Sequence, residues 1–231
     1  MYIKNYLIRK NICLWLTLMF LIISLMIIIG GITRLTDSGL SITRWDLISG
    51  IIPPLNHSQW EISFNLYKKI PEYYLLNSSM TLNEFKSIYW WEYIHRLLGR
   101  LIGLIYIIPL VYFTFKKRIE KARYKSLYLI LFLICLQGYL GWYMVESGLT
   151  ERTDVSHYRL SLHLTLAFII FLFLLWNILI YLKESIILFE KKLPIYLPFL
   201  FLFLVIVQIS LGALVSGLDA GQIYQTWPLM N

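Results

Sequence analysis

Five long apolar runs dominate this sequence and limit what it can fold into. They cover about residues 12–31, 94–115, 126–145, 160–182 and 194–215. A helix needs roughly 20 apolar residues to cross the hydrocarbon core of a bilayer, so each run is long enough to span it. Hydrophobic residues make up 58% of the chain, more than a soluble domain carries. The sequence therefore predicts an all-α membrane protein with five membrane-spanning helices.

Basic residues predict the orientation of these helices. Lys and Arg lie ahead of the first run and in the short segments 116–125 and 183–192. The positive-inside rule puts these segments, and the N-terminus, on the cytoplasmic side. A signal peptide is the alternative, but the first run is long enough to span and no small-residue cleavage site follows it. The net charge of +8 then reflects topology, and no nucleic-acid partner is expected.

The long outer segment, residues 32–93, is expected to contain short helices. Residues 58–61 match a capping box and predict a helix that ends before Pro71. That helix would lie on the membrane surface or cap a pocket, and a plain connecting helix is the equal alternative. A second capping box at residues 81–84 predicts the start of the helix that carries His95. Three aromatic residues share one face of the first helix: Trp60, Phe64 and Tyr67.

The stretch around His95 combines charged and small residues on one helical face. Four residues share that face at helical spacing: Glu92, His95, Gly99 and Gly103. Arg96 and Arg100 flank it. The two glycines leave space in which an imidazole could hold a flat, bulky ligand. The alternative is that they form the small-xxx-small contact of packed membrane helices, with His95 bonded to a neighbour.

A second histidine, His163, is predicted at the same depth as His95. Each lies roughly 20 residues from the basic edge of its helix, Lys116 for His95 and Lys183 for His163, or about 30 Å at the rise of an α-helix. Both helices run in the same direction. Two histidines from separate helices at one height are what a bis-histidine heme requires, with coincidence as the alternative.

Charged residues near the histidines suggest further roles. Arg159 lies one turn before His163, and with Arg96 and Arg100 it could pair with heme propionates. Ordinary snorkelling to lipid headgroups is the alternative. Glu92 could orient His95, pair with Arg96, or stabilise positive charge on a substrate and accept its proton. These three roles stay open.

A weak internal repeat completes the pattern. Residues 30–39 align without gaps on residues 212–221, with Gly, Asp and Gly matched at the first, eighth and tenth places. This suggests a second copy that begins at the fifth run. The expected architecture is a four-transmembrane-helix bundle over residues 1–190, followed by the start of a second, truncated bundle over residues 191–231.

Motifs along nearly the whole chain occur in the same order in one known family. They are found at residues 31–41, Trp45, Pro53-Pro54, residues 71–73, 84–86, 92–100, 138–149, 155–163 and 217–230. In this order they resemble heme A synthase, in the form found in alphaproteobacteria and mitochondria. No single motif would be specific, but their number and order are.

The resemblance implies an oxidoreductase that acts on a CH group, oxidising a methyl group of heme O to the formyl group of heme A for cytochrome c oxidase. His95 and His163 would bind the iron of heme O as axial ligands. Glu92 would stabilise the cation at the methyl carbon before water adds. The family has two pseudo-symmetric bundles and binds heme b in the second. Because this sequence ends at Asn231, that site is expected to be missing, from a fragment or a shortened product.

The expected partners are heme O, membrane lipid, heme O synthase and factors that assemble cytochrome c oxidase, with a homo-oligomer left open. The lack of an Arg/Ser-rich leader favours a bacterium or an organelle-encoded gene. The expected location is the bacterial plasma membrane, with the mitochondrial inner membrane as the alternative. The alternative function is a non-catalytic bis-histidine membrane cytochrome or a heme-delivery protein, which would need His95 and His163 but not Glu92. A helical assembly subunit without a cofactor is the third possibility.

Overall fold

Five long helices form the body of the protein. The computed structural model describes residues 2–46, 49–182, 194, 196–223 and 226, and these residues form helices and no strand. The five helices that are long and apolar enough to cross a membrane confirm the five predicted spans. They are α1 (Tyr2–Leu35), α4 (Leu82–Phe115), α5 (Tyr124–Glu151), α6 (His157–Leu182) and α7 (Tyr196–Gly217).

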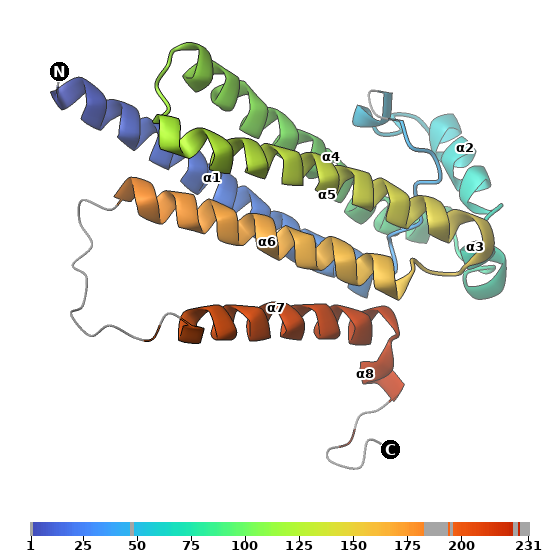
Figure 1. Cartoon of the computed structure of the whole chain (residues 1–231). Coiled ribbons are helices and arrows are strands. Elements are labelled where there is room, and N and C mark those ends of the chain that lie inside the picture. The colour runs from blue at the N-terminus through green and yellow to red at the C-terminus, as the bar shows by residue number, and fades with distance from the viewer. Residues whose placement is uncertain (1, 47–48, 183–193, 195, 224–225, 227–231) are drawn as a thin grey trace.

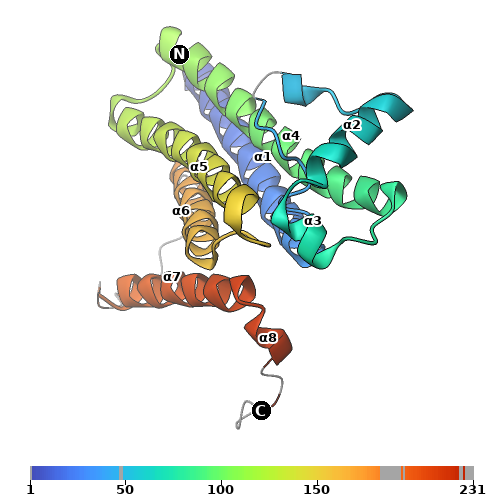
Figure 2. The same cartoon turned by 90° about the vertical axis from the view of Figure 1, so that its right-hand side faces the viewer.

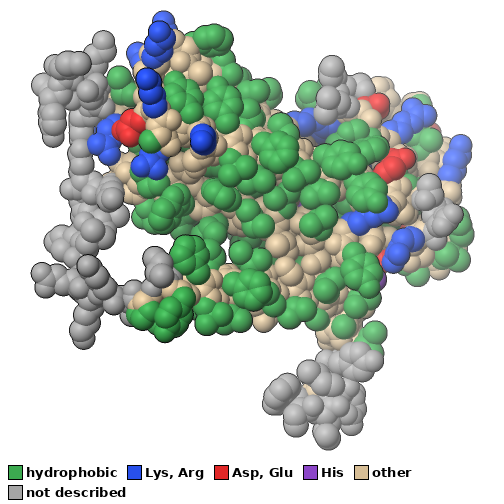
Figure 3. Space-filling view, viewed as in Figure 1, with side chains coloured by type: hydrophobic (Ala, Val, Ile, Leu, Met, Phe, Trp, Pro, Cys, Tyr) green, Lys and Arg blue, Asp and Glu red, His purple; other side chains and the backbone are tan. Residues whose placement is uncertain are grey.

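The first four of these helices form a bundle, and α7 packs outside it. Helix α1 contacts α4 and α6, and α5 contacts the same two helices, so α4 and α6 lie diagonally across the bundle. Helix α7 lies against α6 (Figures 1 and 2). The start of α1 lies at the same end as the α4–α5 turn, which includes η2 (Lys121–Arg123). Hydrophobic side chains cover the middle of the face shown in Figure 3, and charged side chains gather at its two ends.

An apolar core fills the half of the bundle nearer the α4–α5 turn. Two hydrogen bonds to main-chain oxygens tie its aromatic side chains across helices: the Trp15 indole donates to Ile105 at 2.9 Å, and the Tyr106 hydroxyl donates to Leu127 at 2.8 Å. Close packing of this kind holds membrane helices together because lipid is as apolar as their side chains. The core includes Leu16, Met19, Ile102, Tyr106, Leu110, Ile130, Ile134, Leu166, Ile170 and Leu174.

A second apolar cluster caps the opposite end of the bundle. It joins α2 (His57–Tyr67), α3 (Pro71–Leu76) and the first turns of α4. The face of α2 predicted from Trp60, Phe64 and Tyr67 is confirmed, because all three side chains are buried in this cluster. Helix α2 contacts α4 and caps the end of the bundle. The connection before α2 contains one turn of 3-10 helix, η1 (Ser49–Ile51).

One predicted capping box is confirmed and the other is wrong. Thr81 and Glu84 form both hydrogen bonds of the box that begins α4. Helix α2 instead begins one residue before Ser58, and Asn56 is its N-cap. The Asn56 side chain accepts from the Gln59 amide at 2.9 Å, and Oε1 of Gln59 accepts from the Leu55 amide at 2.7 Å. Asn is at least as good an N-cap as Ser, and this reciprocal pair satisfies two amides at once.

The two stretches of the predicted repeat end their helices in the same way. Helix α1 ends at Leu35 and α7 ends at Gly217, which are equivalent places in the alignment. Two residues later, Asp37 and Asp219 have φ angles of 48° and 50°. Asp is among the few residues that adopt this left-handed conformation readily. The predicted domain boundary at 190/191 falls outside the described residues.

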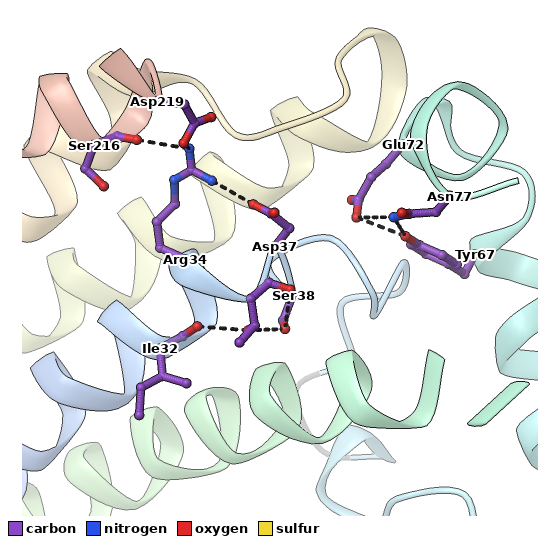
Figure 4. Close-up of polar contacts among 10 residues, drawn as sticks. Ile32, Arg34, Asp37, Ser38, Tyr67, Glu72, Asn77, Ser216 and Asp219 are labelled. Carbon is purple, nitrogen blue, oxygen red and sulfur yellow. Dashed lines mark hydrogen bonds and ion pairs between the residues drawn. The ribbon is translucent and has the colours of Figure 1, made fainter. Parts of the chain in front are cut away.

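Arg34 connects these two turns. Its guanidinium donates to Asp37 at 2.9 Å and to Asp219 at 2.6 Å, and it also reaches the main-chain oxygen of Ser216 at 3.0 Å (Figure 4). Helix α8 (Ala220–Ile223) follows directly. One arginine therefore holds the ends of α1 and α7 together although they lie far apart in the sequence.

The carboxyl group of Glu72 is buried in the second apolar cluster, which we call the outer cap. Glu72 is 3% exposed and accepts from the Tyr67 hydroxyl at 2.9 Å, and Asn77 donates to the same hydroxyl at 2.8 Å (Figure 4). Burial raises the pKa of Glu72 to about 8, although the hydrogen bond from Tyr67 opposes this shift. The negative charges of Glu92 and Asp37 add to it. The fold therefore favours the protonated form of Glu72.

We expect Glu72 to make the protein less stable as the pH rises. The raised pKa means that the folded protein binds this proton more tightly than the unfolded chain, whose pKa is near 4.5. The free energy of unfolding should therefore fall between about pH 4.5 and pH 8, by at most about 1.4 kcal/mol per pH unit. In Glu72→Gln this decline should be absent. Thermal unfolding in detergent between pH 4.5 and pH 8 measures how stability depends on pH. Glu146→Gln, at an exposed position, is the control. Parallel curves for wild type and Glu72→Gln would contradict the assignment.

Candidate functional site

The predicted histidines both lie against glycines of neighbouring helices. His95 is on α4, and a Cβ atom on Gly30 of α1 would lie 3.3 Å from its Nε2. His163 is on α6, and a Cβ atom on Gly141 of α5 would lie 3.1 Å from its Cε1. Both histidines thus lie inside the bundle, on the diagonal helices α4 and α6.

The layer of the bundle that contains these imidazoles has few fully buried residues on α4 and α6. In α4, no residue between Arg96 and Ile102 is buried, and in α6 none lies between Ser161 and Leu166. The apolar core lies on one side of this layer and the outer cap on the other. A Cβ atom added to Gly103 would meet nothing within 4 Å among the described residues. This layer has the small residues that a flat ligand between two imidazoles requires.

Gln137 of α5 contacts the ring of His163. Its amide nitrogen lies 3.2 Å from Nε2 of His163 and 3.1 Å from the main-chain oxygen of the same residue. Gln137 and Gly141 are four residues apart, so one face of α5 holds the ring at two points. Within the described part of the chain, Oε1 of Gln137 and Nδ1 of His163 are buried without a hydrogen-bond partner.

Glu92 is buried beneath the outer loop and is fully engaged there. One carboxylate oxygen accepts from the Ser41 hydroxyl and from the Ile42 amide, both at 2.7 Å. The other oxygen accepts from Nε of Arg96 at 2.9 Å and from its NH2 group. Of the three roles that the sequence left open for Glu92, this geometry shows the pair with Arg96. The described hydrogen bonds of Glu92 do not include one to His95.

Arg96 completes the attachment of the loop. It donates to the main-chain oxygens of Ile42 at 2.8 Å and Arg44 at 3.0 Å, and its guanidinium lies 5.0 Å from the centre of the Trp45 ring. We call residues 41–46 the outer strap, because this segment runs along α4 and is held there by Glu92 and Arg96. The donors of Arg96 are thus used within the protein, whereas the sequence suggested a propionate partner.

The other two predicted arginines lie at the edges of the site. Arg100 donates to the main-chain oxygen of Asp46 at 2.9 Å, in the outer strap. Arg159 donates to the main-chain oxygen of Tyr143 at 3.0 Å and lies over the Tyr143 ring. A cavity of about 370 Å³ lies under the outer strap, and Arg96 and Arg100 are in its lining. Neither His95 nor His163 lines this cavity.

The remaining histidines lie away from this layer. His57 is 72% exposed beside Glu61, and His157 begins α6 next to Gly217 of α7. Sequence reasoning missed the glycines that face the rings and the role of Gln137. The i, i+4 spacing of Gln137 and Gly141 was a signal for one shared helix face, but the sequence did not indicate which helix that face meets.

The fold and this site define a helical, multi-pass membrane protein with paired histidines inside its bundle. Residues 13–231 match the family model described as "Cytochrome oxidase assembly protein" (COX15-CtaA). The chain belongs to this family.

Several relatives are close to half identical to this chain over the aligned residues. It is 52% identical to the heme A synthase of Pelagibacter ubique, over 98% of this chain and 66% of that protein. It is 48% identical to the heme A synthase of Rickettsia bellii, over 96% and 67%, and 46% identical to that of Rhodopseudomonas palustris, over 96% and 61%. The chain thus spans about two thirds of the length of these relatives. No solved structure matches it.

We expect the stability effects of Glu92 and Arg96 to be strongly coupled. Either Glu92→Ala or Arg96→Ala leaves one buried charge without its partner, which costs about 3–5 kcal/mol. The double variant removes both charges, so it should cost clearly less than the sum of the single variants. Thermal unfolding of the wild type, the two single variants and the double variant in detergent gives the coupling free energy between the two residues. The half-exposed pair Arg152–Asp154 is the control, with an expected coupling of about 1 kcal/mol or less. Additive effects at Glu92 and Arg96 would show that their pairing contributes little.

Proposed function

We propose that this chain is the heme O-binding part of a heme A synthase and oxidises a methyl group of heme O to the formyl group of heme A. One observation carries the proposal. His95 and His163 each lie against a glycine of a neighbouring helix, Gly30 and Gly141, in a chain that is about half identical to proteins named heme A synthase. The histidine pair explains how a heme would be held, and the relatives indicate what happens to it.

The residues of the layer fit a heme as the substrate. Two imidazoles can supply both axial ligands to its iron. Gly30 and Gly141 present bare backbone to the two rings, so that the rings and a flat macrocycle can share the interior of the bundle. Nδ1 of His163, which has no partner among the described residues, is the nitrogen that an iron bound at Nε2 would leave free for a second contact.

Arginines at the outer edge of the layer suit the heme propionates. Arg100 and Arg159 lie at this edge, and each donates to a main-chain oxygen. A propionate carboxylate would form a stronger, charge-assisted bond with either of them. Arg96 contributes indirectly in this proposal, because its donors hold Glu92 and the outer strap.

Glu92 is proposed as the carboxylate that acts on the substrate. The conversion of a methyl to a formyl group consumes one water and releases four protons and four electrons to an acceptor. A carboxylate near the methyl carbon would stabilise the positive charge that develops as electrons leave, and it would accept a proton. Glu92 is already held by Ser41, Ile42 and Arg96. It would therefore take on this role only as its contact with the outer strap loosens.

The proposed location is a bacterial plasma membrane with the N-terminus inside. The start of α1 and the basic α4–α5 turn lie at one end of the bundle (Figure 1), and positive segments stay on the cytoplasmic side. The histidine layer then lies near the outer boundary. Heme O synthase is proposed as the source of the substrate, and the factors that assemble cytochrome c oxidase as the recipients of the product.

The proposed reaction can be tested in a host that makes heme O but no heme A. Expression of the protein should produce heme A, as measured by chromatography of extracted hemes. His95→Ala and His163→Ala should leave only heme O, because each removes one axial ligand. Glu92→Gln should do the same while it keeps an oxygen for Ser41 and Ile42 to donate to. The amount of each variant in the membrane is measured alongside, with His57→Ala, at an exposed position, as the control.

Two other outcomes would change the proposal. Normal heme A in the His95 and His163 variants would contradict the assignment of these ligands. Bound heme without conversion, in wild type and in Glu92→Gln alike, would favour the non-catalytic membrane cytochrome or heme-delivery protein. The contacts of Glu92 with the outer strap are the observation that keeps this second function open, because they give the carboxylate a structural role.

The glycines that face the rings should be essential for heme binding. Gly30→Ala would place a methyl group against His95, and Gly141→Ala would place one against His163. Overpacking of this kind costs about 1–3 kcal/mol, or roughly a 5- to 150-fold loss of heme affinity if the ring must move. Gly31→Ala and Gly138→Ala are matched controls on the same helices, since a Cβ atom there meets nothing within 4 Å among the described residues. Spectroscopic titration with hemin measures the affinity, and equal losses in the controls would contradict a specific contact.

A further inference from the structure

We infer that Gln137 is a positioning residue that holds Nε2 of His163 ready for iron and must release it when a heme binds. The inference rests on the proposed function, because it takes Nε2 of His163 as an iron ligand. It goes beyond that function because Gln137 is assigned a role of its own.

The first step is the orientation of the Gln137 amide. Its nitrogen lies 3.1 Å from the main-chain oxygen of His163, which can only accept a hydrogen bond. The amide nitrogen, and not the amide oxygen, must therefore face this oxygen. The same nitrogen lies 3.2 Å from Nε2 of His163, and its two hydrogens allow it to donate to both atoms.

The second step is the tautomer of the imidazole. An amide nitrogen is only a donor, so Nε2 of His163 must present its lone pair and Nδ1 must carry the hydrogen. Nε2 with a free lone pair is the form of histidine that binds iron. Gln137 therefore selects the ligating tautomer before any heme is present. Gly141, one turn further along α5, supports the Cε1 edge of the same ring.

The third step is the competition between Gln137 and iron. The lone pair of Nε2 cannot accept from Gln137 and bind iron at once, so the hydrogen bond must break as the heme enters. The described contacts leave Oε1 of Gln137 and Nδ1 of His163 buried without partners. Such groups cost free energy, so the heme-free arrangement is poised to change. The second amide hydrogen keeps Gln137 on the main-chain oxygen of His163 after the release.

Two variants of Gln137 should act in opposite directions. Gln137→Leu removes the competing hydrogen bond, and we expect hemin to bind roughly 2- to 10-fold more tightly, as the loss of one ordinary hydrogen bond implies. Gln137→Glu replaces the donor with an acceptor, which favours a hydrogen on Nε2, the wrong tautomer for ligation. We expect it to weaken the binding of hemin at least tenfold, a step of about 1.4 kcal/mol. The readout is the low-spin absorption of bis-histidine heme during titration of the purified full chain.

Gln208→Leu is the matched control. Gln208 precedes Leu211 and Gly212 with the same spacing as Gln137 precedes Leu140 and Gly141, but it is exposed on α7. It should bind hemin as the wild type does. Nitrogen-15 NMR of His163 in the heme-free protein adds a readout that needs no heme: Nε2 should be unprotonated in the wild type and protonated in Gln137→Glu.

The outcomes separate this inference from the proposed function. If hemin binding does not depend on His163, the proposed site is wrong. If binding depends on His163 but both Gln137 variants bind as the wild type does, the role of Gln137 alone is wrong. If Gln137→Leu and Gln137→Glu weaken the binding of hemin equally, Gln137 only fills space. A protonated Nε2 in the heme-free wild type would also overturn the inference.

Discussion

Two imidazoles that lie against bare helix backbone are the contacts on which the candidate site depends. His95 lies against Gly30 and His163 against Gly141, so each ring takes the space that a side chain would fill. The packed core below and the aromatic cap above hold the four helices in place on either side of this layer. The layer itself can then have few fully buried residues, because its neighbours supply most of the packing.

The outer strap links this layer to the end of the bundle that α2 and α3 cap. Glu92 and Arg96 form a buried pair, and main-chain groups of residues 41–46 satisfy their remaining hydrogen-bonding capacity. Such a pair costs desolvation, which only good geometry and further hydrogen bonds offset. The same carboxylate is proposed to act on the substrate. A residue with both tasks would couple the movement of the strap to the chemistry, since the pair must loosen before the charge of Glu92 becomes available.

Much of the fold could be predicted because lipid cannot hydrogen-bond to the backbone. Apolar runs of this length must form helices in a membrane, and all five predicted spans are present. The capping box at Thr81 was predictable because it needs only residues three positions apart. The prediction at Ser58 was wrong because Asn56 was a competing N-cap two residues earlier, and sequence order does not decide between neighbouring caps.

The order of residues alone predicts that His95 and His163 lie at one depth, since helix rise is constant and both helices end at basic edges. It also puts Glu92 and Arg96 one turn apart, within reach of each other. Only the packing of distant helices decides that Gly30 and Gly141 lie under the rings, that Gln137 reaches His163, and that residues 41–46 cover Glu92. Helical periodicity fixes which residues share a face, but which face meets which depends on how side chains from separate helices fit together.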